Sequence, residues 1–144
     1  MTPLARSKGV EIGMRTEPLP GLQSSLAIFM LDLDSELLFI GDAGATEASR
    51  PSRRVGFELT NYYRPNRWLT LDADLAFASA RFRDDAPEGR RIPGAIEGVA
   101  SIAASVDGIG PWSGALQLRW IGPRALVEDD SVRSQATTTL NGRV

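Results

Sequence analysis

The stretch RWLTLDADLAFASARF, residues 67–82, separates into two rows of side chains when every second residue is taken. Successive side chains of a β-strand point to opposite faces, so a strand sorts its residues into two such rows. One row here is apolar, whereas the other carries the carboxylates of Asp72 and Asp74. The pattern predicts a strand whose two faces meet different surroundings. The rows are Leu69, Leu71, Ala73, Leu75 and Phe77 on one face and Thr70, Asp72, Asp74, Ala76 and Ala78 on the other.

Further segments alternate with the same period, which predicts an all-β chain with about six to seven long strands. Proline and glycine interrupt the chain at short intervals, and the alternation would scatter apolar residues around a helix. Residues Glu36–Ile40 either extend the second strand or begin a hairpin beyond it. The other expected strands are Gly9–Arg15, Leu22 to about Asp34, Arg53–Tyr63, Glu97–Val106, Trp112–Ile121 and a last one that begins near Thr137.

The connections between the expected strands alternate between short and long. In a soluble β-sandwich, loop length has no reason to follow such an order. In an outer-membrane β-barrel it does, because the periplasmic turns are tight and the extracellular loops are long. The alternation therefore favours a barrel. The short connections are Pro18–Gly21, Arg64–Arg67 and Asp107–Pro111, and the long ones are Gly41–Ser52, Arg83–Ala95 and Gly122–Ala136.

Strand length and aromatic placement agree with this interpretation. Membrane-crossing strands need about 9–11 residues at a tilt near 45°, and several of the expected strands reach that length. Trp112 and Trp120 bracket one apolar row, and at about 3.3 Å per residue and this tilt they differ by about 20 Å in height, near the ~25 Å apolar band of such barrels. Trp68, Tyr62 and Tyr63 flank a short turn, as a periplasmic girdle would.

The predicted fold is thus an antiparallel meander of about six to seven long tilted strands, part of a transmembrane β-barrel. The apolar row of residues 69–77 is expected to face lipid, while Thr70, Asp72 and Asp74 are expected to face a wet lumen. The alternative is a soluble β-sandwich that binds carbohydrate or protein. Strand order separates the two, because a neighbour-to-neighbour meander favours the barrel and Greek-key crossovers favour the sandwich. A porin-like channel would share the barrel architecture.

Composition limits the chemistry of the chain. The formal net charge is −2, and the sequence has neither cysteine nor histidine. Disulfides, thiolate metal sites and the commonest general base are therefore excluded, and nucleic acid is disfavoured as a partner. The single lysine, Lys8, lies near the N-terminus. We predict that the chain is not an enzyme, has no catalytic residue and needs no cofactor.

Several charged clusters invite a functional interpretation, and each has a plainer one. Asp32, Asp34 and Glu36 alternate, which suits either a Ca²⁺ site or an acidic stripe that faces the lumen or lies at the base of a loop. The plainer interpretation is favoured, so no metal site is predicted. Asp72 and Asp74 form a second pair, for which the hydrated lumen is favoured over a hydrolase carboxylate pair.

The charged residues of the long loops are interpreted in the same way. Asp84-Asp85 and Asp129-Asp130 are expected to be solvated, with Asp129-Asp130 also placed to reach an extracellular ligand or ion. The arginines suit an anionic substrate or the phosphates of outer-leaflet lipid, but a solvated loop is favoured. Gly41–Gly44 is too short for a phosphate-binding loop. The arginines are Arg50, Arg53, Arg54, Arg90 and Arg91.

Three long runs of the sequence carry a family resemblance. They are PSRRVGFELTNYYRPNRWLTLDADLAFASARF from residue 51, EGRRIPGAIEGVASIAASV from residue 88 and WSGALQLRWIGPRALVEDDSVRSQATTTLNGRV from residue 112. The elements Ile92-Pro93-Gly94 and Gly122-Pro123-Arg124, in their order and spacing, resemble the C-terminal barrel half of TonB-dependent outer-membrane receptors. The resemblance extends over nearly the whole chain and includes Trp68-Leu69, Ala73-Asp74 and Gly41–Gly44.

The resemblance implies a barrel of about 22 strands around an N-terminal plug. Such receptors lie in the Gram-negative outer membrane and import scarce ligands, such as ferric siderophores, cobalamin or sugars, with energy passed on through TonB. The implied partners are outer-membrane lipid, the rest of the barrel, the plug, the TonB complex and an extracellular ligand. The resemblance names neither that ligand nor the residues that bind it.

Residues 1–144 are accordingly expected to be a partial receptor barrel. The sequence shows no signal peptide, no TonB-contacting segment, no plug and no closing aromatic-ended strand. The smallest membrane barrels use about eight strands. The chain is therefore expected to be a fragment that is not competent for transport alone, and its broad apolar face and open edges are expected to make it aggregate in water.

Overall fold

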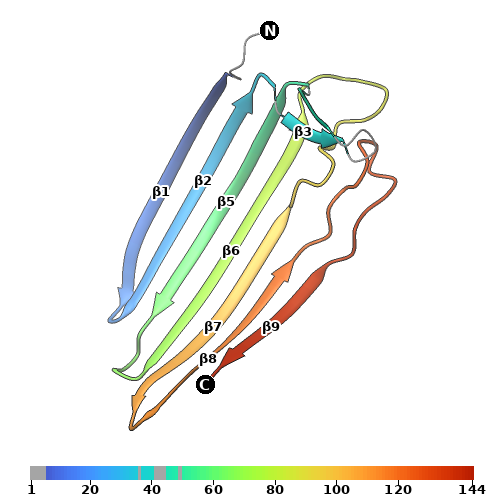
Figure 1. Ribbon diagram of the computed structural model, residues 1–144. Coiled ribbons are helices and arrows are strands. Elements are labelled where there is room, and N and C mark those ends of the chain that lie inside the picture. Colours follow the sequence, from blue (N-terminus) through green and yellow to red (C-terminus); the bar gives the residue numbers. More distant parts are fainter. Residues whose placement is uncertain (1–5, 36, 41–44, 49) are drawn as a thin grey trace.

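The computed structural model describes residues 6–35, 37–40, 45–48 and 50–144. Seven antiparallel strands form one open sheet in the order β1-β2-β5-β6-β7-β8-β9, and β3 and β4 form a separate two-stranded sheet (Figure 1). Among the described residues, no helix is long and apolar enough to cross a membrane. The strands are β1 (Ser7–Leu19), β2 (Leu22–Leu33), β3 (Leu37–Ile40), β4 (Ala45–Ala48), β5 (Ser52–Tyr63), β6 (Leu69–Phe82), β7 (Gly98–Ile109), β8 (Trp112–Ile121) and β9 (Thr137–Arg143).

The large sheet is a meander, because each of its strands pairs with the next one along the chain apart from the β3–β4 insertion. Within the described residues, β1 and β9 make no contact with each other. No Greek-key crossover and no second layer is present in that part of the chain. The predicted all-β antiparallel meander is confirmed, and the strand order favours the barrel over the sandwich.

Some strand limits differ from those expected. The first strand was expected to end at Arg15, but β1 continues to Leu19, because pairing with β2 resumes after a register shift between Thr16 and Leu19. A similar shift lets β7 continue to Ile109. Of the two interpretations of residues 36–40, the hairpin is correct, since β3 pairs with β4 inside what was expected to be a plain long loop. Glu36 itself lies outside the described residues.

Strand register places all apolar rows on one side of the sheet. In β6, Leu75 pairs with Leu59 on one side and Ala100 on the other, so neighbouring strands align their apolar rows. We call the resulting surface the apolar face. It consists of Val10, Ile12, Met14, Leu26, Ile28, Met30, Val55, Phe57, Leu59, Leu71, Ala73, Leu75, Phe77, Ala100, Ile102, Ala104, Leu116, Leu118, Trp120 and Leu140.

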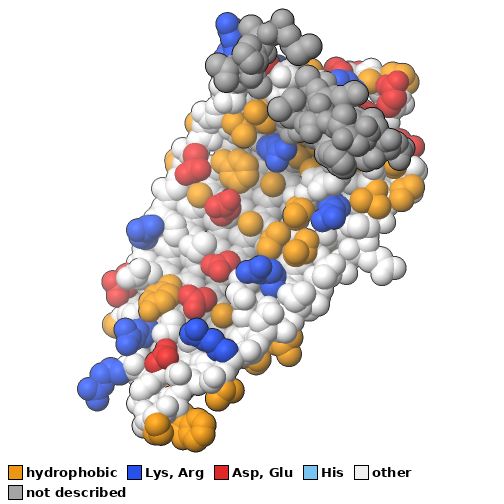
Figure 2. All heavy atoms as spheres, in the orientation of Figure 1, with side chains coloured by type: hydrophobic (Ala, Val, Ile, Leu, Met, Phe, Trp, Pro, Cys, Tyr) orange, Lys and Arg blue, Asp and Glu red, His pale blue; other side chains and the backbone are white. Residues whose placement is uncertain are grey.

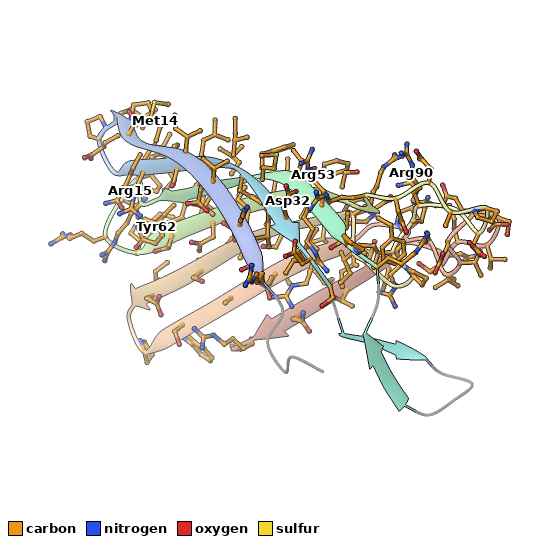
Figure 3. The ribbon with its side chains drawn as sticks, turned by 90° about the horizontal axis from the view of Figure 1, so that it is seen from above. Met14, Arg15, Asp32, Arg53, Tyr62 and Arg90 are labelled. Atoms are coloured by element: carbon orange, nitrogen blue, oxygen red, sulfur yellow. The ribbon has the colours of Figure 1, made fainter. Side chains whose placement is uncertain are left out.

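The opposite side of the sheet, which we call the polar face, carries Asp72, Asp74 and the residues that alternate with the apolar rows. Figure 2 shows basic and acidic side chains scattered over this face, with apolar side chains between them. The two faces separate neighbouring residues, as Figure 3 shows for Met14 and Arg15 on β1. The neighbouring strands share the sidedness predicted for residues 69–77, although in β2 the row on the polar face includes the apolar residues Phe29 and Leu31.

The buried residues lie at the end of the sheet where the long loops lie. Ala80 and Phe82 of β6 pack with Ile92 and with Ala95, which is partly buried. Ser52, at the start of β5, is fully buried beside them in register with Phe82. Among the described residues, this core lies only at the loop end and covers neither face along the rest of the strands.

The register of β5 and β6 predicts the outcome of a cross-linking experiment. Thr60 and Asp74 are partners, whereas Ser101 lies one strand further on, next to Asp74. Two strand spacings separate Thr60 from Ser101 by about 10 Å, more than the ~7 Å that a disulfide allows between Cα atoms. Because the chain has no cysteine, oxidising Thr60→Cys/Asp74→Cys should give an intramolecular disulfide. Thr60→Cys/Ser101→Cys should give none, and the reverse result would contradict this register.

Candidate membrane-facing surface and loop rim

The apolar face is continuous and open to solvent in the isolated chain. Ile12 is 74% exposed, Ile102 is 58% exposed and Leu140 is 65% exposed, although they lie on β1, β7 and β9 respectively. The rings of Phe57 and Phe77 stack with centroids 6.2 Å apart near the middle of the sheet. Soluble monomers rarely expose apolar patches above a few hundred Å². A surface of this breadth is suited to contact with hydrocarbon.

Aromatic residues lie at both ends of this surface. Trp112 and Trp120 stand at opposite ends of β8, and Tyr63 ends the apolar row of β5. Tyr62, which was grouped with Tyr63 in the expected girdle, instead pairs with Asp72 and belongs to the polar face. It lies on the same side of the sheet as Arg15 (Figure 3). The assignment of these rings to a membrane girdle stays a prediction.

The short turn between β5 and β6 is organised by Asn66. Its side-chain Oδ1 accepts hydrogen bonds from the backbone N–H of Trp68 at 3.1 Å and of Leu69 at 3.0 Å. An asparagine that accepts bonds from the residues after it fixes a tight turn without a long loop. The turn therefore sets the register in which the apolar row of β6 begins.

The polar face holds the carboxylates of Asp72 and Asp74. Asp74 accepts a hydrogen bond from the hydroxyl of Ser101 at 3.3 Å, across the β6–β7 pair. Gln23, Thr60 and Tyr62 line the same hollow as the two carboxylates. This environment is polar and open, so the carboxylates resemble a hydrated wall more than an acid–base pair.

Ion pairs join the two long loops that follow β6 and β8. Glu97 accepts from Arg91 at 2.6 Å through Oε1 and from Arg133 at 2.7 Å through Oε2. Asp130 pairs with the same two arginines, so the four side chains form a closed ring. Arg91 was interpreted as a solvated or anion-binding residue, but it is engaged between loops here. We call this ring, with the contacts around Arg50, the loop rim.

Arg50 holds the other side of the loop rim. Its guanidinium pairs with Asp84 at 3.2 Å and with Glu128, and it lies 4.1 Å from the centre of the Phe82 ring. It also donates to the carbonyl oxygen of Gly89 at 2.9 Å. The expectation that Arg50 and Asp84 are simply solvated is therefore wrong, because loop folding brings these opposite charges together over an aromatic ring.

Asp32, the first residue of the expected acidic cluster Asp32, Asp34 and Glu36, does not lie on the polar face. Glu36 lies outside the described residues. Asp32 lies in the register of the apolar face, at its loop end, where it accepts two hydrogen bonds from Arg53 at 2.6 and 2.8 Å. The loop-base interpretation holds for Asp32, and the lumen-facing one is wrong. Among the described residues, no group of three carboxylates lies close enough to hold a metal ion.

Asp129 belongs to a local turn in the loop between β8 and β9. The backbone N–H of Ser131 donates to its carboxylate at 3.0 Å, and the Ser131 hydroxyl donates at 2.7 Å. These bonds, the backbone one first, hold the pKa of Asp129 below its ordinary value of 3.8. A carboxyl whose folded pKa is depressed contributes stability above its ordinary pKa and loses it as pH falls through the folded value.

The hydrogen bonds of this turn predict a lowered pKa for the carboxyl of Asp129. In a carbon-13 NMR titration, Asp129 should titrate below 3.8 and the order of the turn should be lost only as pH falls through that midpoint. Ser131→Ala removes the hydroxyl donor and keeps the backbone donor, so the pKa should rise part of the way back. A midpoint at or above the ordinary value in the parent chain would contradict the hydrogen-bonding described here.

The chain was compared with known protein families, curated proteins and solved structures. No protein-family model and no curated protein matches the sequence. The ferric yersiniabactin uptake receptor FyuA from Yersinia pestis matches with 18% identity and a TM-score of 0.77, over 96% of this chain and 22% of that one. The ferric-catecholate import receptor Fiu from E. coli K12 matches with 16% identity and a TM-score of 0.72, over 96% and 20%. The copper transporter OprC matches with 21% identity and a TM-score of 0.71, over 96% and 23%.

This is the barrel-wall fold of TonB-dependent receptors. The resemblance seen in the sequence is thereby confirmed at the level of fold, and it concerns a part of those receptors, since the chain spans about a fifth of the length of each. All three neighbours are uptake or transport proteins, and none is an enzyme.

Proposed function

We propose that this chain forms a segment of the barrel wall of a TonB-dependent outer-membrane receptor. The observation that carries the proposal is the apolar face, which has residues on all seven strands of the large sheet and is covered by nothing in the described chain. In a membrane barrel such a surface is covered by lipid tails, while the alternating polar residues meet water in the lumen. The protein would therefore be located in the Gram-negative outer membrane.

The soluble binding module is the weaker candidate on energetic grounds. A sandwich of this length would bury its apolar rows between two sheets. Of the residues whose burial the structure describes, the buried apolar ones are Ala80, Phe82, Ile92 and Ala125, all at the loop end. Burial of apolar area contributes about 25 cal/mol per Å², so strands that keep their apolar rows exposed need another apolar medium to be stable.

The rest of a receptor would supply the further strands, the plug and the energy source that the seven-stranded sheet does not contain. Each of β1 and β9 pairs with one neighbour in the described sheet, so each presents an open edge to which further barrel strands would pair. We infer that residues 1–144 act as part of a larger barrel with a plug and with the TonB complex as energy source. By itself the segment would not transport.

The ligand class proposed is a scarce metal chelate, with a ferric siderophore first. Two of the three structural neighbours are named as receptors for ferric complexes and the third as a copper transporter. The identities of 16–21% do not carry a ligand from one protein to another. No residue of the described chain is therefore assigned to ligand binding.

Deletion of the gene for the receptor that would contain this segment tests the proposal in cells. Under iron limitation, loss of the protein should remove the uptake of one class of radioactive ferric chelate, and loss of TonB should remove the same uptake. The parent protein should fractionate with the outer membrane and resist extraction by carbonate. Recovery in the soluble fraction, or unchanged uptake of every ferric and copper chelate tested, would contradict the proposal.

A further inference from the structure

A cluster of basic residues borders the apolar face at its loop end. Arg53 and Arg81 are register partners on β5 and β6, one step beyond the pair Val55 and Ser79. With Arg83 and Arg90 they line a hollow of about 330 Å³ that also reaches Val55. Figure 3 shows Arg53 and Arg90 on the same side of the sheet as Met14, which belongs to the apolar face. The cluster thus continues the apolar face toward the loops.

Two of these arginines, Arg81 and Arg83, make no ion pair within the described part of the chain, although Arg83 acts on Asp32 at longer range. Arg53 pairs with Asp32, and Arg90 pairs with Asp85 at 2.8 Å. Among the described residues, neither Arg81 nor Arg83 has a carboxylate within salt-bridge distance, and both side chains are exposed. Lys8 adds a further cation, since it is the register partner of Asp32 on β1. The hollow therefore has an excess of positive charge at the boundary of an apolar surface.

We propose that this hollow binds the phosphate group of an anionic lipid in the membrane leaflet at the loop end. The proposal rests on the function proposed above, because it requires the apolar face to meet lipid. A guanidinium group presents paired N–H donors that match phosphate oxygens. Arg81 and Arg83 supply such donors without first breaking an ion pair. The adjacent Val55, Phe57 and Phe77 lie where the acyl chains of the same lipid would run.

The position of the cluster distinguishes a lipid from a free anion. A soluble phosphate would gain from the arginines alone, whereas a phospholipid would also bury its tails against the apolar face. The arginines of the loop rim, Arg50, Arg91 and Arg133, are already paired with carboxylates, and none of them is among the residues that line the hollow. The unpaired charge is therefore concentrated where headgroup phosphates of the leaflet would lie.

Calorimetry on the whole chain in dodecyl maltoside, a detergent without phosphate, tests the proposal. Dihexanoyl phosphatidic acid is the probe, with dihexanoyl phosphatidylcholine and inorganic phosphate as comparisons. Each basic residue near an anionic lipid surface is worth about a fivefold change in affinity. The variant Arg81→Gln/Arg83→Gln should therefore bind phosphatidic acid about 30-fold more weakly than the parent, and binding by the parent should weaken as salt is raised.

Arg15→Gln/Arg119→Gln is the matched control, because it removes the same charge from exposed positions on the polar face. Its affinity for phosphatidic acid should stay within about twofold of the parent. Equal losses in the two double variants would overturn the proposal, since they would reflect net charge alone. Inorganic phosphate that binds as tightly as phosphatidic acid would also overturn it, in favour of a free-anion site.

Cell fractionation separates this inference from the function on which it rests. If the parent protein is recovered in the soluble fraction, the barrel-wall proposal fails. If the parent protein fractionates with the outer membrane and Arg81→Gln/Arg83→Gln still binds phosphatidic acid with parental affinity, the lipid site alone fails.

Discussion

Replacing Ile102 by arginine should strongly impair insertion of the chain into a lipid bilayer. Ile102 lies near the middle of the apolar face, with Ala73 and Leu118 as its register partners, and its side chain is 58% exposed. An arginine at the midplane on the lipid side of a barrel costs about 2–4 kcal/mol. Urea titration of the chain refolded into phosphatidylcholine vesicles, read by tryptophan fluorescence, should show a stability loss of about that size.

The matched control is the preceding residue. Ser101 belongs to the polar face, where its hydroxyl bonds Asp74 and its register partner on β8 is Arg119. Ser101→Arg places the same side chain in the lumen, where water solvates it and Asp74 partly balances it. Its effect should stay below about 1 kcal/mol. A larger loss of stability for Ser101→Arg would place Ser101, and not Ile102, on the lipid side. Equal losses for the two variants would also contradict the assignment, since they would show no difference between the faces.

Alanine at Gly56 should destabilise the sheet from within. A Cβ atom at this position would lie 2.3 Å from the carbonyl oxygen of Phe77 and 2.7 Å from the ring of Phe29. The oxygen belongs to the backbone of β6, so it can retreat only if the β5–β6 pairing is disturbed. Overpacking of this kind costs about 1–3 kcal/mol. The same urea titration should show that loss for Gly56→Ala, with slower refolding into vesicles as a second readout.

Gly142→Ala provides the comparison, since a Cβ there would meet its nearest atom, Cδ1 of Leu116, at 3.6 Å, an ordinary contact distance. Its stability should change by less than about 0.5 kcal/mol. If Gly56→Ala were tolerated as well as Gly142→Ala, the close approach of Phe29 and β6 to Gly56 would not exist in the protein.

The residue pattern predicted most of the sheet, because the two-residue alternation determines the face on which each side chain lies and the short turns determine which strands are neighbours. The alternation of residues 69–77 determines which side each residue takes, and the tight turn at Asn66 carries that alternation in register to β5. The short turns also make neighbours along the chain neighbours in the sheet. Strand limits were less accurate, because a register shift such as that after Thr16 lets a strand continue beyond its alternating part.

The loop rim was not predictable by the same means. Glu97 and Arg133 are 36 residues apart, and Arg50 and Glu128 are 78 apart. No period or spacing relates such residues, since their contact depends on the path that each long loop takes. Glu97 was read only as a polar strand residue, and Arg133 was not singled out. A pattern of opposite charges at the ends of consecutive long loops was the one available signal, and it does not specify partners.

The basic hollow could be predicted only in part from the sequence, because its residues come together through strand register. Arg53 was recognised as a possible anion-binding residue, but Arg81 appeared to be the ordinary end of a strand and Arg83 the first residue of a long loop. Only the register, which makes Arg53 and Arg81 partners and places them beyond Val55, joins them into one surface. Asp32 was likewise assignable to a face only once its pairing with Arg53 was known.

A nitroxide scan of β6 tests the central claim most directly. Because the chain has no cysteine, single cysteines at positions 70–77 accept a spin label one at a time in chain refolded into phosphatidylcholine vesicles. The account predicts that labels at 71, 73, 75 and 77 are accessible to oxygen dissolved in the bilayer. Labels at 70, 72, 74 and 76 should instead be accessible to a water-soluble nickel chelate. Labels at the odd positions that are shielded from both reagents would place the apolar row against protein, and they would contradict the membrane-facing assignment.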